Sequence, residues 1–237
     1  MVLFLPKRWI LSCAAALLLL ATAVSMLRVP TTAAVIAPRP IAEKERSVFV
    51  LDAGHGGADG GAVSHSGVYE SEINLDITLR LRDIFALLGC QTVLTRSDER
   101  SLADDPAASL RQQKISDTKN RVKLINTVNG AVLISIHQNS LPGHGSVHGA
   151  QVFYSATNGS DELAERIQQQ LNSIINVDNG KSKKPISHDI YLMNHVACPA
   201  VLVECGFLSN DAEAMRLQDP QYQTLLALNI CCSTMEK

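Results

Sequence analysis

The sequence has 237 residues and a formal net charge of −2 at pH 7, with 19% charged and 4% aromatic residues. A chain of this length can bury a substantial core, and its charge balance excludes the strongly basic surface with which proteins bind nucleic acid. With so few aromatic side chains, we expect the core to be packed mainly by aliphatic residues.

Residues 1–27 are predicted to be a membrane-targeting segment. A Lys-Arg pair precedes an apolar run over residues 9–27 that contains no charged residue. The run is long enough to cross a bilayer, and the positive charges before it favour a cytoplasmic amino terminus. The segment is either an uncleaved signal anchor or a signal peptide cut near Ala23 or Ala34. In both cases it contacts the membrane, and the rest of the chain is exported.

Residues 28–45 contain three prolines and no hydrophobic period, so we expect a linker there and one folded domain over residues 46–237. The six cysteines show no paired spacing, which argues against a thiolate metal site. We expect most of them to be small buried hydrophobic residues.

From residue 47 onward, strand-like and helix-like patterns alternate. Apolar residues spaced for a helix occur over 73–88, where Gly89 ends the helix, and over 163–174, with Ser160 as the expected N-cap. The polar stretch 97–119 is expected to be a surface insertion near the functional site. Runs rich in β-branched residues predict strands at 48–52, 91–95, 131–137, 150–155 and 200–204. Near-continuous apolar strands separated by helices predict a single α/β domain with a mostly parallel, mixed central sheet flanked by helices on both faces.

The stretch DAGHGGADGG, which begins at Asp52, places five glycines around one histidine. It does not fit a dinucleotide fingerprint, because Asp59 stands where the third glycine is needed, and it lacks the lysine of a phosphate loop. Both of those sites also need a helix to begin at the glycines, whereas here a loop follows and the helix is expected from about Ser71. A metal site is therefore the better interpretation.

Candidate ligands stand at the ends of the predicted strands. His55 follows the first strand, His137 ends AVLISIH and Glu204 ends AVLVE. The carboxyl ends of strands in an open α/β sheet meet at one edge, where ligands bind. Two imidazoles and one carboxylate are the protein ligands of a catalytic zinc, and a further carboxylate can transfer protons. Glu70 and Glu72, at the start of the first helix, are equally placed to complete the ligand set.

Other polar residues are candidates for supporting roles. Asn139, just after the strand that ends at His137, either orients substrate or caps its own loop, and His188 is a candidate for the wall of the cleft. Arg121 and Asn126 lie on a helical pattern and are expected to brace the loop after His137. The remaining histidines are expected in solvent: His65, His144, His148 and His195. Of these, His144 and His148 are also candidates for a position near the substrate.

Six ordered blocks from Ser47 to the carboxyl terminus resemble the zinc-dependent N-acetylmuramoyl-L-alanine amidases of the Amidase_3 family. The blocks are DAGHGGADGGAV, GVYESEINLDITLRLRDIF, VLTR, NRVKLIN, LISIHQNS and PAVLVECGFLSN. The resemblance implies that His55, Glu70 and His137 bind one Zn²⁺ per chain and that Glu204 is the catalytic acid and base. Ala53 departs from the family, which usually has proline there.

A narrower resemblance is to the CwlD-type, germination-specific amidases of spore-forming bacteria. It rests on RVKLIN, GAQVFYS, HDIYLMNHVACPAVLVECGFLSN and the amino-terminal segment. It implies an enzyme exported to the intermembrane space of the developing spore. There it would cleave the amide between N-acetylmuramic acid and L-alanine in cortex peptidoglycan, as the first step of muramic-δ-lactam formation. Some clostridial relatives need a lipoprotein partner, so an accessory lipoprotein is a candidate partner of this chain.

Three alternatives stay open on the sequence. The chain could be an amidase of general vegetative wall turnover, or a peptidoglycan-binding domain of the same fold that has lost activity. Loss of a ligand or of Glu204 would indicate the silent domain, and all four residues are present. A two-metal exopeptidase would need further carboxylate ligands, for which Asp52 and Asp59 are the candidates.

Overall fold

The computed structural model describes residues 47–235, so the predicted membrane segment and linker lie outside the described residues. The strands are β1 (Val48–Ala53), β2 (Thr92–Leu94), β3 (Ala131–Asn139), β4 (Gln151–Tyr154), β5 (Lys184–Pro185) and β6 (Ala200–Phe207). The helices are α2 (Glu70–Leu87), α3 (Leu110–Asn126), α4 (Ser160–Ile174), α5 (Tyr191–His195), α6 (Asp211–Leu217) and α7 (Pro220–Met235). Within this part of the chain, no helix combines the length and the hydropathy needed to span a membrane.

The strands form one mixed sheet in the order β2-β1-β3-β6-β4-β5. β2, β1, β3 and β6 run parallel, while β4 is antiparallel to β6 and parallel to β5. The central strands β1, β3 and β6 are adjacent and almost entirely buried. The predicted α/β fold with a mostly parallel, mixed sheet is confirmed.

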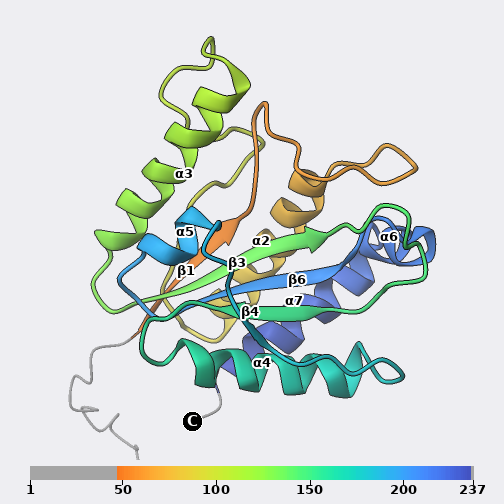
Figure 1. Cartoon of the computed structure of the whole chain (residues 1–237). Coiled ribbons are helices and arrows are strands. Elements are labelled where there is room, and N and C mark those ends of the chain that lie inside the picture. Colours follow the sequence, from red (N-terminus) through yellow and green to blue (C-terminus); the bar gives the residue numbers. More distant parts are fainter. Residues whose placement is uncertain (1–46, 236–237) are drawn as a thin grey trace, which may run out of the picture. The chain divides into compact units, whose positions relative to one another are not determined.

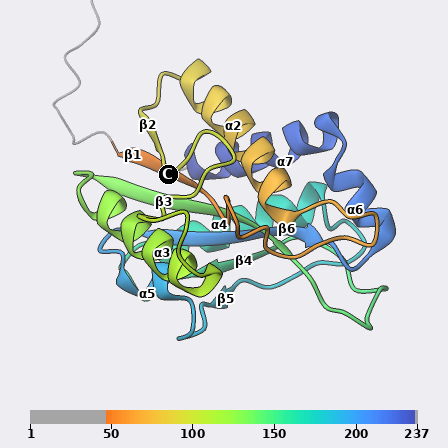
Figure 2. The same ribbon diagram turned by 90° about the horizontal axis from the view of Figure 1, so that it is seen from above.

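Alternate residues of the central strands enter two separate hydrophobic cores. Leu51, Ile134 and Val203 pack with α2, α4 and α7, whereas Leu133 and Leu202 pack with α3 and α5. Figures 1 and 2 show these two groups of helices on opposite faces of the sheet. Both faces are covered, which explains why the strands read as continuous apolar runs rather than as alternating patterns.

Two local predictions differ from the structure, and one short strand has no counterpart among the predictions. The stretch predicted as an insertion over 97–119 contains the first turns of α3, whose few buried residues leave no apolar stripe to reveal the helix. Ser160 is not an N-cap: the N-cap of α4 is Gly159 at φ +85°, and Ser160 Oγ accepts a hydrogen bond from the Ala200 amide at 2.9 Å. The two-residue strand β5 was not predicted, because it is too short to carry a pattern.

The cysteines are less uniformly buried than expected. All five in the described residues are free thiols, but only Cys205 and Cys231 are buried. Cys90 and Cys198 are partly exposed, and Cys232 is exposed. No pair of cysteines in residues 47–235 therefore holds the fold together as a disulfide.

Candidate active site

The site lies at the carboxyl ends of the three central strands. His55 follows β1, His137 lies near the end of β3, and Glu204 lies in β6 directly opposite His137 in the parallel register. Glu204 shares the face of the sheet with Leu202, two residues earlier, which packs with α3 and α5. The site therefore opens on the α3 and α5 side of the sheet.

His55, Glu70 and His137 form the one cluster of potential metal ligands among residues 47–235. One ligand atom from each lies within 4.8 Å of the others. Glu70 Oε1 is 3.3 Å from His55 Nε2 and 3.0 Å from His137 Nδ1. Glu72, the competing carboxylate, is exposed to solvent. Two imidazoles and one buried carboxylate converging on one point fit the three protein ligands of a catalytic zinc.

The carboxylate of Glu70 is held in place by backbone amides. The Ala62 amide donates to Oε2 at 2.9 Å, and the Gln138 amide donates to Oε1 at 3.1 Å. Burial opposes the charge of Glu70, but hydrogen bonds to His137 and His55 outweigh it and lower the pKa well below its usual range. The carboxylate of Glu70 is therefore ionised at neutral pH and held in a fixed orientation.

Asp59 fixes the ring of His55. Its Oδ2 lies 2.9 Å from His55 Nδ1, and its Oδ1 accepts an ion pair from Lys114 of α3 at 2.8 Å. Burial lowers the pKa of His55, but hydrogen bonds to Asp59 and Glu70 raise it to about 9. A carboxylate on Nδ1 leaves Nε2 to face the cluster, which is the usual support of a histidine metal ligand. On the sequence alone, Asp59 is a candidate only for the ligand of a second metal.

Two arginines hold the backbone that presents His55. Arg121 donates to the carbonyls of Ala53 and His55 at 2.6 Å each. Arg96 donates to the carbonyls of Ala53 at 2.9 Å and Gly54 at 3.1 Å. His55 has φ +62°, a left-handed conformation that is uncommon for a residue with a side chain and needs such support. The backbone of the loop is thus fixed by side chains from outside it.

These contacts correct the roles expected for two helix residues. Arg121 braces the loop that carries His55, not the loop after His137. Asn126 hydrogen-bonds the His195 carbonyl and the Ala197 amide, so it joins α3 to the segment after α5. The spacing of residues along a helix does not show which neighbouring loop each side chain will contact, so these two contacts could not be predicted from the sequence.

Asp52 takes no part in the ligand cluster. Its carboxylate accepts hydrogen bonds from Arg121 at 2.7 Å, Ser135 at 2.6 Å and Thr95 at 2.7 Å. Burial opposes its charge, but Arg121 and the two hydroxyls lower its pKa to about 2. With Asp52 committed to Arg121 and Asp59 to His55, neither supports the two-metal exopeptidase alternative.

Glu204 has the properties of a proton-transfer group. Burial raises its pKa to about 7, against an opposing effect of His137. Its Oε2 is buried and has no hydrogen-bond partner among the described residues. A carboxyl group that titrates near neutrality and keeps one oxygen unpartnered can accept a proton and return it.

Two positions of the DAGHGGADGG stretch must be glycine because the side chains of His55, Glu70 and His137 lie close to their backbone. A Cβ at Gly54 would lie 2.3 Å from the ring of His137. A Cβ at Gly61, where φ is +70°, would lie 2.5 Å from Glu70 Oε2 and 2.8 Å from His55 Cδ2. The glycines therefore make room for the ligand side chains, and no helix begins at them to bind a phosphate.

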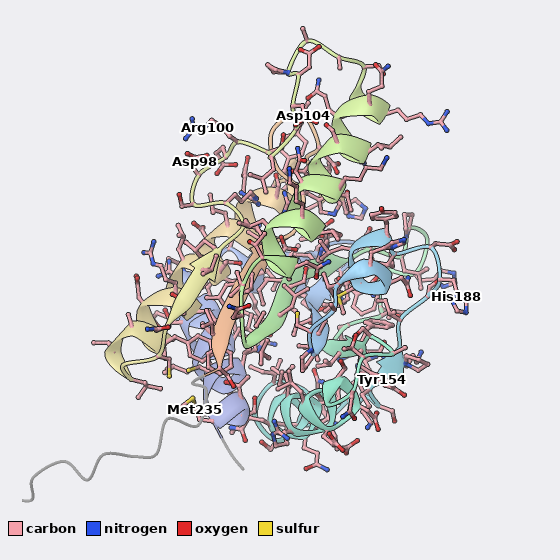
Figure 3. All side chains as sticks on the ribbon, turned by 90° about the vertical axis from the view of Figure 1, so that its left-hand side faces the viewer. Asp98, Arg100, Asp104, Tyr154, His188 and Met235 are labelled. Atoms are coloured by element: carbon pink, nitrogen blue, oxygen red, sulfur yellow. The ribbon has the colours of Figure 1, made fainter. Side chains whose placement is uncertain are left out.

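A cavity of about 520 Å³ contains the cluster and Glu204, with α3 and α5 contributing to its walls. Asn139 lines it, while its Oδ1 accepts a hydrogen bond from the Ser140 amide at 2.8 Å, so the side chain also caps its own loop. His188 does not line this cavity: it is exposed and points away from the body of the protein (Figure 3). Its neighbours Asp189 and Tyr191 line the cavity instead.

The remaining histidines lie at the surface, as expected. His65 is 2.6 Å from the exposed Asp211 carboxylate. The others are also exposed: His144, His148 and His195. None of them lines the cavity that contains the cluster.

The chain is similar to known peptidoglycan amidases in sequence and in structure. Residues 49–233 match the Amidase_3 family, described as N-acetylmuramoyl-L-alanine amidase. The germination-specific N-acetylmuramoyl-L-alanine amidase of Bacillus subtilis is 38% identical over 184 residues, which cover 77% of this chain and 76% of that protein.

Solved structures of amidases are also similar to this chain. The CwlD amidase of Clostridioides difficile, in complex with the GerS lipoprotein, superposes with a TM-score of 0.75 at 38% identity, covering 79% of this chain and 95% of that one. The catalytic domain of CwlV, an N-acetylmuramoyl-L-alanine amidase of Bacillus (Paenibacillus) polymyxa, gives 0.67 at 29% identity, covering 79% and 95%.

Proposed function

The chain belongs to the Amidase_3 family and is an N-acetylmuramoyl-L-alanine amidase, and from this premise we propose that it is a zinc enzyme of the spore cortex. Its substrate is peptidoglycan, and the bond cleaved joins the lactyl group of N-acetylmuramic acid to L-alanine. The observation that carries the proposal is the His55, Glu70 and His137 cluster beside Glu204, whose Oε2 has no partner among the described residues.

His55, Glu70 and His137 would hold the zinc ion, one per chain. When bound, zinc acts as a Lewis acid that polarises a carbonyl group and lowers the pKa of water. The donor set fits this ion because it combines two ring nitrogens with an ionised carboxylate. Asp59 keeps Nδ1 of His55 engaged, so that Nε2 is the nitrogen turned to the cluster.

Glu204 is the acid and base of the reaction. It lines the same cavity as the ligands and lies opposite His137 across β3 and β6. In its charged form it takes a proton from the attacking water, and it then donates that proton to the amine of the departing L-alanine. Burial keeps the proton affinity of Glu204 high enough for the second transfer. Asn139, on the wall of the cavity, orients the substrate.

The spore role rests on the similarity to the germination-specific enzyme of Bacillus subtilis. The chain would act after export, in the intermembrane space of the developing spore, and expose the lactyl group from which muramic-δ-lactam is made. The CwlD relative was solved with a lipoprotein bound, which supports an accessory lipoprotein for this chain as well.

Digestion of purified cortex peptidoglycan, read by mass spectrometry, tests the proposal. We expect peptides with an amino-terminal L-alanine, and we expect them to disappear with a chelator and with Glu204→Gln. Zinc content measured on the same samples separates loss of metal from loss of the proton-transfer group. A protein that binds zinc but releases no such peptide, with or without its candidate lipoprotein, would refute the activity.

Deletion of the gene separates the spore role from general wall turnover. Spores that lack muramic-δ-lactam while vegetative cells divide and separate normally would support the cortex role. Spores with normal lactam content and chains of unseparated cells would instead assign the enzyme to vegetative wall.

A further inference from the structure

A second cavity of about 250 Å³ adjoins the one that contains the ligand cluster. Lys114, Thr118 and Tyr191 line both cavities, so the two share a wall. Ile115 and Lys119 complete the smaller one, which lies between α3 and α5 and is called the annex below. Figures 1 and 2 both show these two helices side by side on one face of the sheet.

The annex differs from the main cavity in its charge. Carboxylates line the main cavity, namely Asp52, Asp59, Glu70, Asp117, Asp189 and Glu204. No carboxylate lines the annex, which carries two lysines instead. Lys114 is paired with Asp59, whereas Lys119 has no carboxylate oxygen within 4.0 Å among the described residues. Lys119 is thus the unneutralised cation at this end of the cleft.

The wall of the annex also includes apolar surface that is exposed to solvent. Ile115 is 46% exposed and Tyr191 is 40% exposed, although both are large side chains on the wall of a cavity. An apolar wall beside an unpaired ammonium group suits a ligand that offers both apolar surface and a carboxylate, such as an acidic peptide.

We propose that the annex binds the peptide stem of the substrate and that Lys119 pairs with the free carboxylate of its second residue. The inference rests on the proposed function. In peptidoglycan the residue after L-alanine is a D-glutamate linked through its side chain, which leaves its α-carboxylate free unless it is amidated. Two extended residues span about 7 Å, so this carboxylate falls close to the cleaved amide.

The annex and the ligand cluster are linked through Lys114, which lines both cavities. Lys114 Nζ is 2.8 Å from Asp59, whose other oxygen is 2.9 Å from His55 Nδ1. The shared wall is therefore two hydrogen bonds from a ligand of the cluster. The proposal directs the peptide from the cleaved bond toward α3 and α5.

Soluble, uncrosslinked glycan strands that carry either D-glutamate or D-isoglutamine at the second stem position test the annex. Wild type should show about fivefold higher kcat/KM on the carboxylate strands, as expected for one exposed ion pair. Lys119→Ala should lose that preference, and Lys119→Arg should retain it. Lys123→Ala is the matched control, since Lys123 is an exposed lysine one turn further along α3 that lines neither cavity.

Equilibrium binding of the same strands to Glu204→Gln, with and without Lys119→Ala, gives a measurement that needs no turnover. Equal loss on both strand types, or an unchanged preference in Lys119→Ala, would overturn the annex while leaving the amidase intact. If neither strand nor cortex peptidoglycan is cleaved by wild type, the proposed function fails, and the binding preference then still decides on Lys119.

Discussion

At the scale of single residues, Asp59 supports the ring of His55, and its effect should appear in zinc affinity. Its carboxylate holds Nδ1 of His55 and is itself paired with Lys114. Asp59→Asn should weaken zinc binding by about 10- to 100-fold, because a neutral amide supports the ring less well than a carboxylate. Competition with a chelator of known affinity measures the change.

Asp211→Asn is the control for that experiment. Asp211 makes a comparable contact, 2.6 Å from the exposed His65, and lines neither cavity. Its loss should leave zinc affinity unchanged. Equal affinity of wild type and Asp59→Asn would contradict the supporting role of Asp59.

Asp52 makes stability depend on pH. Its pKa is about 2 in the folded protein and 3.8 in an unfolded chain. A lowered folded pKa means that the contribution is complete above about pH 4 and is lost as the pH falls toward 2; it amounts to about 2 kcal/mol. The difference in unfolding free energy between wild type and Asp52→Asn should therefore shrink by that amount between pH 5 and pH 2.5, as measured by denaturant titration. The exposed Asp83→Asn should show no such change, and a constant Asp52 difference would disprove the pairing.

At the scale of elements, α3 fixes the loop after β1 through one side chain. Arg121 pairs with the carboxylates of Asp52 and Asp117 and donates to two loop carbonyls. Arg121→Gln should lower the free energy of unfolding by about 3 to 5 kcal/mol, since it leaves two buried carboxylates without their cation. Arg121→Lys should lose less stability but still weaken zinc binding, because an ammonium cannot reach the carbonyls as a planar guanidinium does.

Denaturant unfolding and zinc competition on both variants measure these effects. Arg111→Gln, at an exposed position in the first turn of the same helix, should change neither quantity. Full zinc affinity in a folded Arg121→Lys protein would show that the loop does not need the clamp.

The central elements could be predicted because burial on both faces leaves a direct mark on the sequence. The runs 48–52, 131–137 and 200–204 became β1, β3 and β6, each slightly longer than expected. α3 was partly hidden in a polar stretch, since its buried positions include the charged residues Asp117 and Arg121. A pattern of hydrophobicity cannot reveal a helix that packs through an ion-pair network.

Some residues of the candidate site could likewise be predicted from the sequence, and others could not. His55, His137 and Glu204 could be placed near one another because strand ends meet at one sheet edge. Spacing did not distinguish Glu70 from Glu72, and only the fold shows one carboxylate buried and the other exposed. On sequence His188 is a candidate for the wall of the cleft, but its loop turns the side chain to solvent and presents its neighbours instead (Figure 3).

At the scale of the whole molecule, the ligand cluster joins segments that are far apart in the chain. His55 comes from the loop after β1, Glu70 from the start of α2 and His137 from β3. An unfolded chain does not bring these atoms within 4.8 Å of one another, so an ion held by this cluster would bind the folded state. Zinc at 100 times its Kd should then stabilise the protein by about 2.7 kcal/mol and raise Tm by about 5 to 10 °C.

The zinc-dependent rise in Tm can test which carboxylate binds the ion, because Glu70 and Glu72 are only two residues apart. Glu70→Gln should abolish the zinc-dependent rise in Tm, because it removes the charged ligand while keeping the size of the side chain. Glu72→Gln changes the charge by the same amount at an exposed position of the same helix turn, and it should keep the full rise. Differential scanning calorimetry with and without zinc distinguishes the two. A full rise in the Tm of Glu70→Gln would mean that the ion is held elsewhere. If the rise is lost in Glu70→Gln and kept in Glu72→Gln, the zinc-dependent stability of the whole domain depends on this cluster.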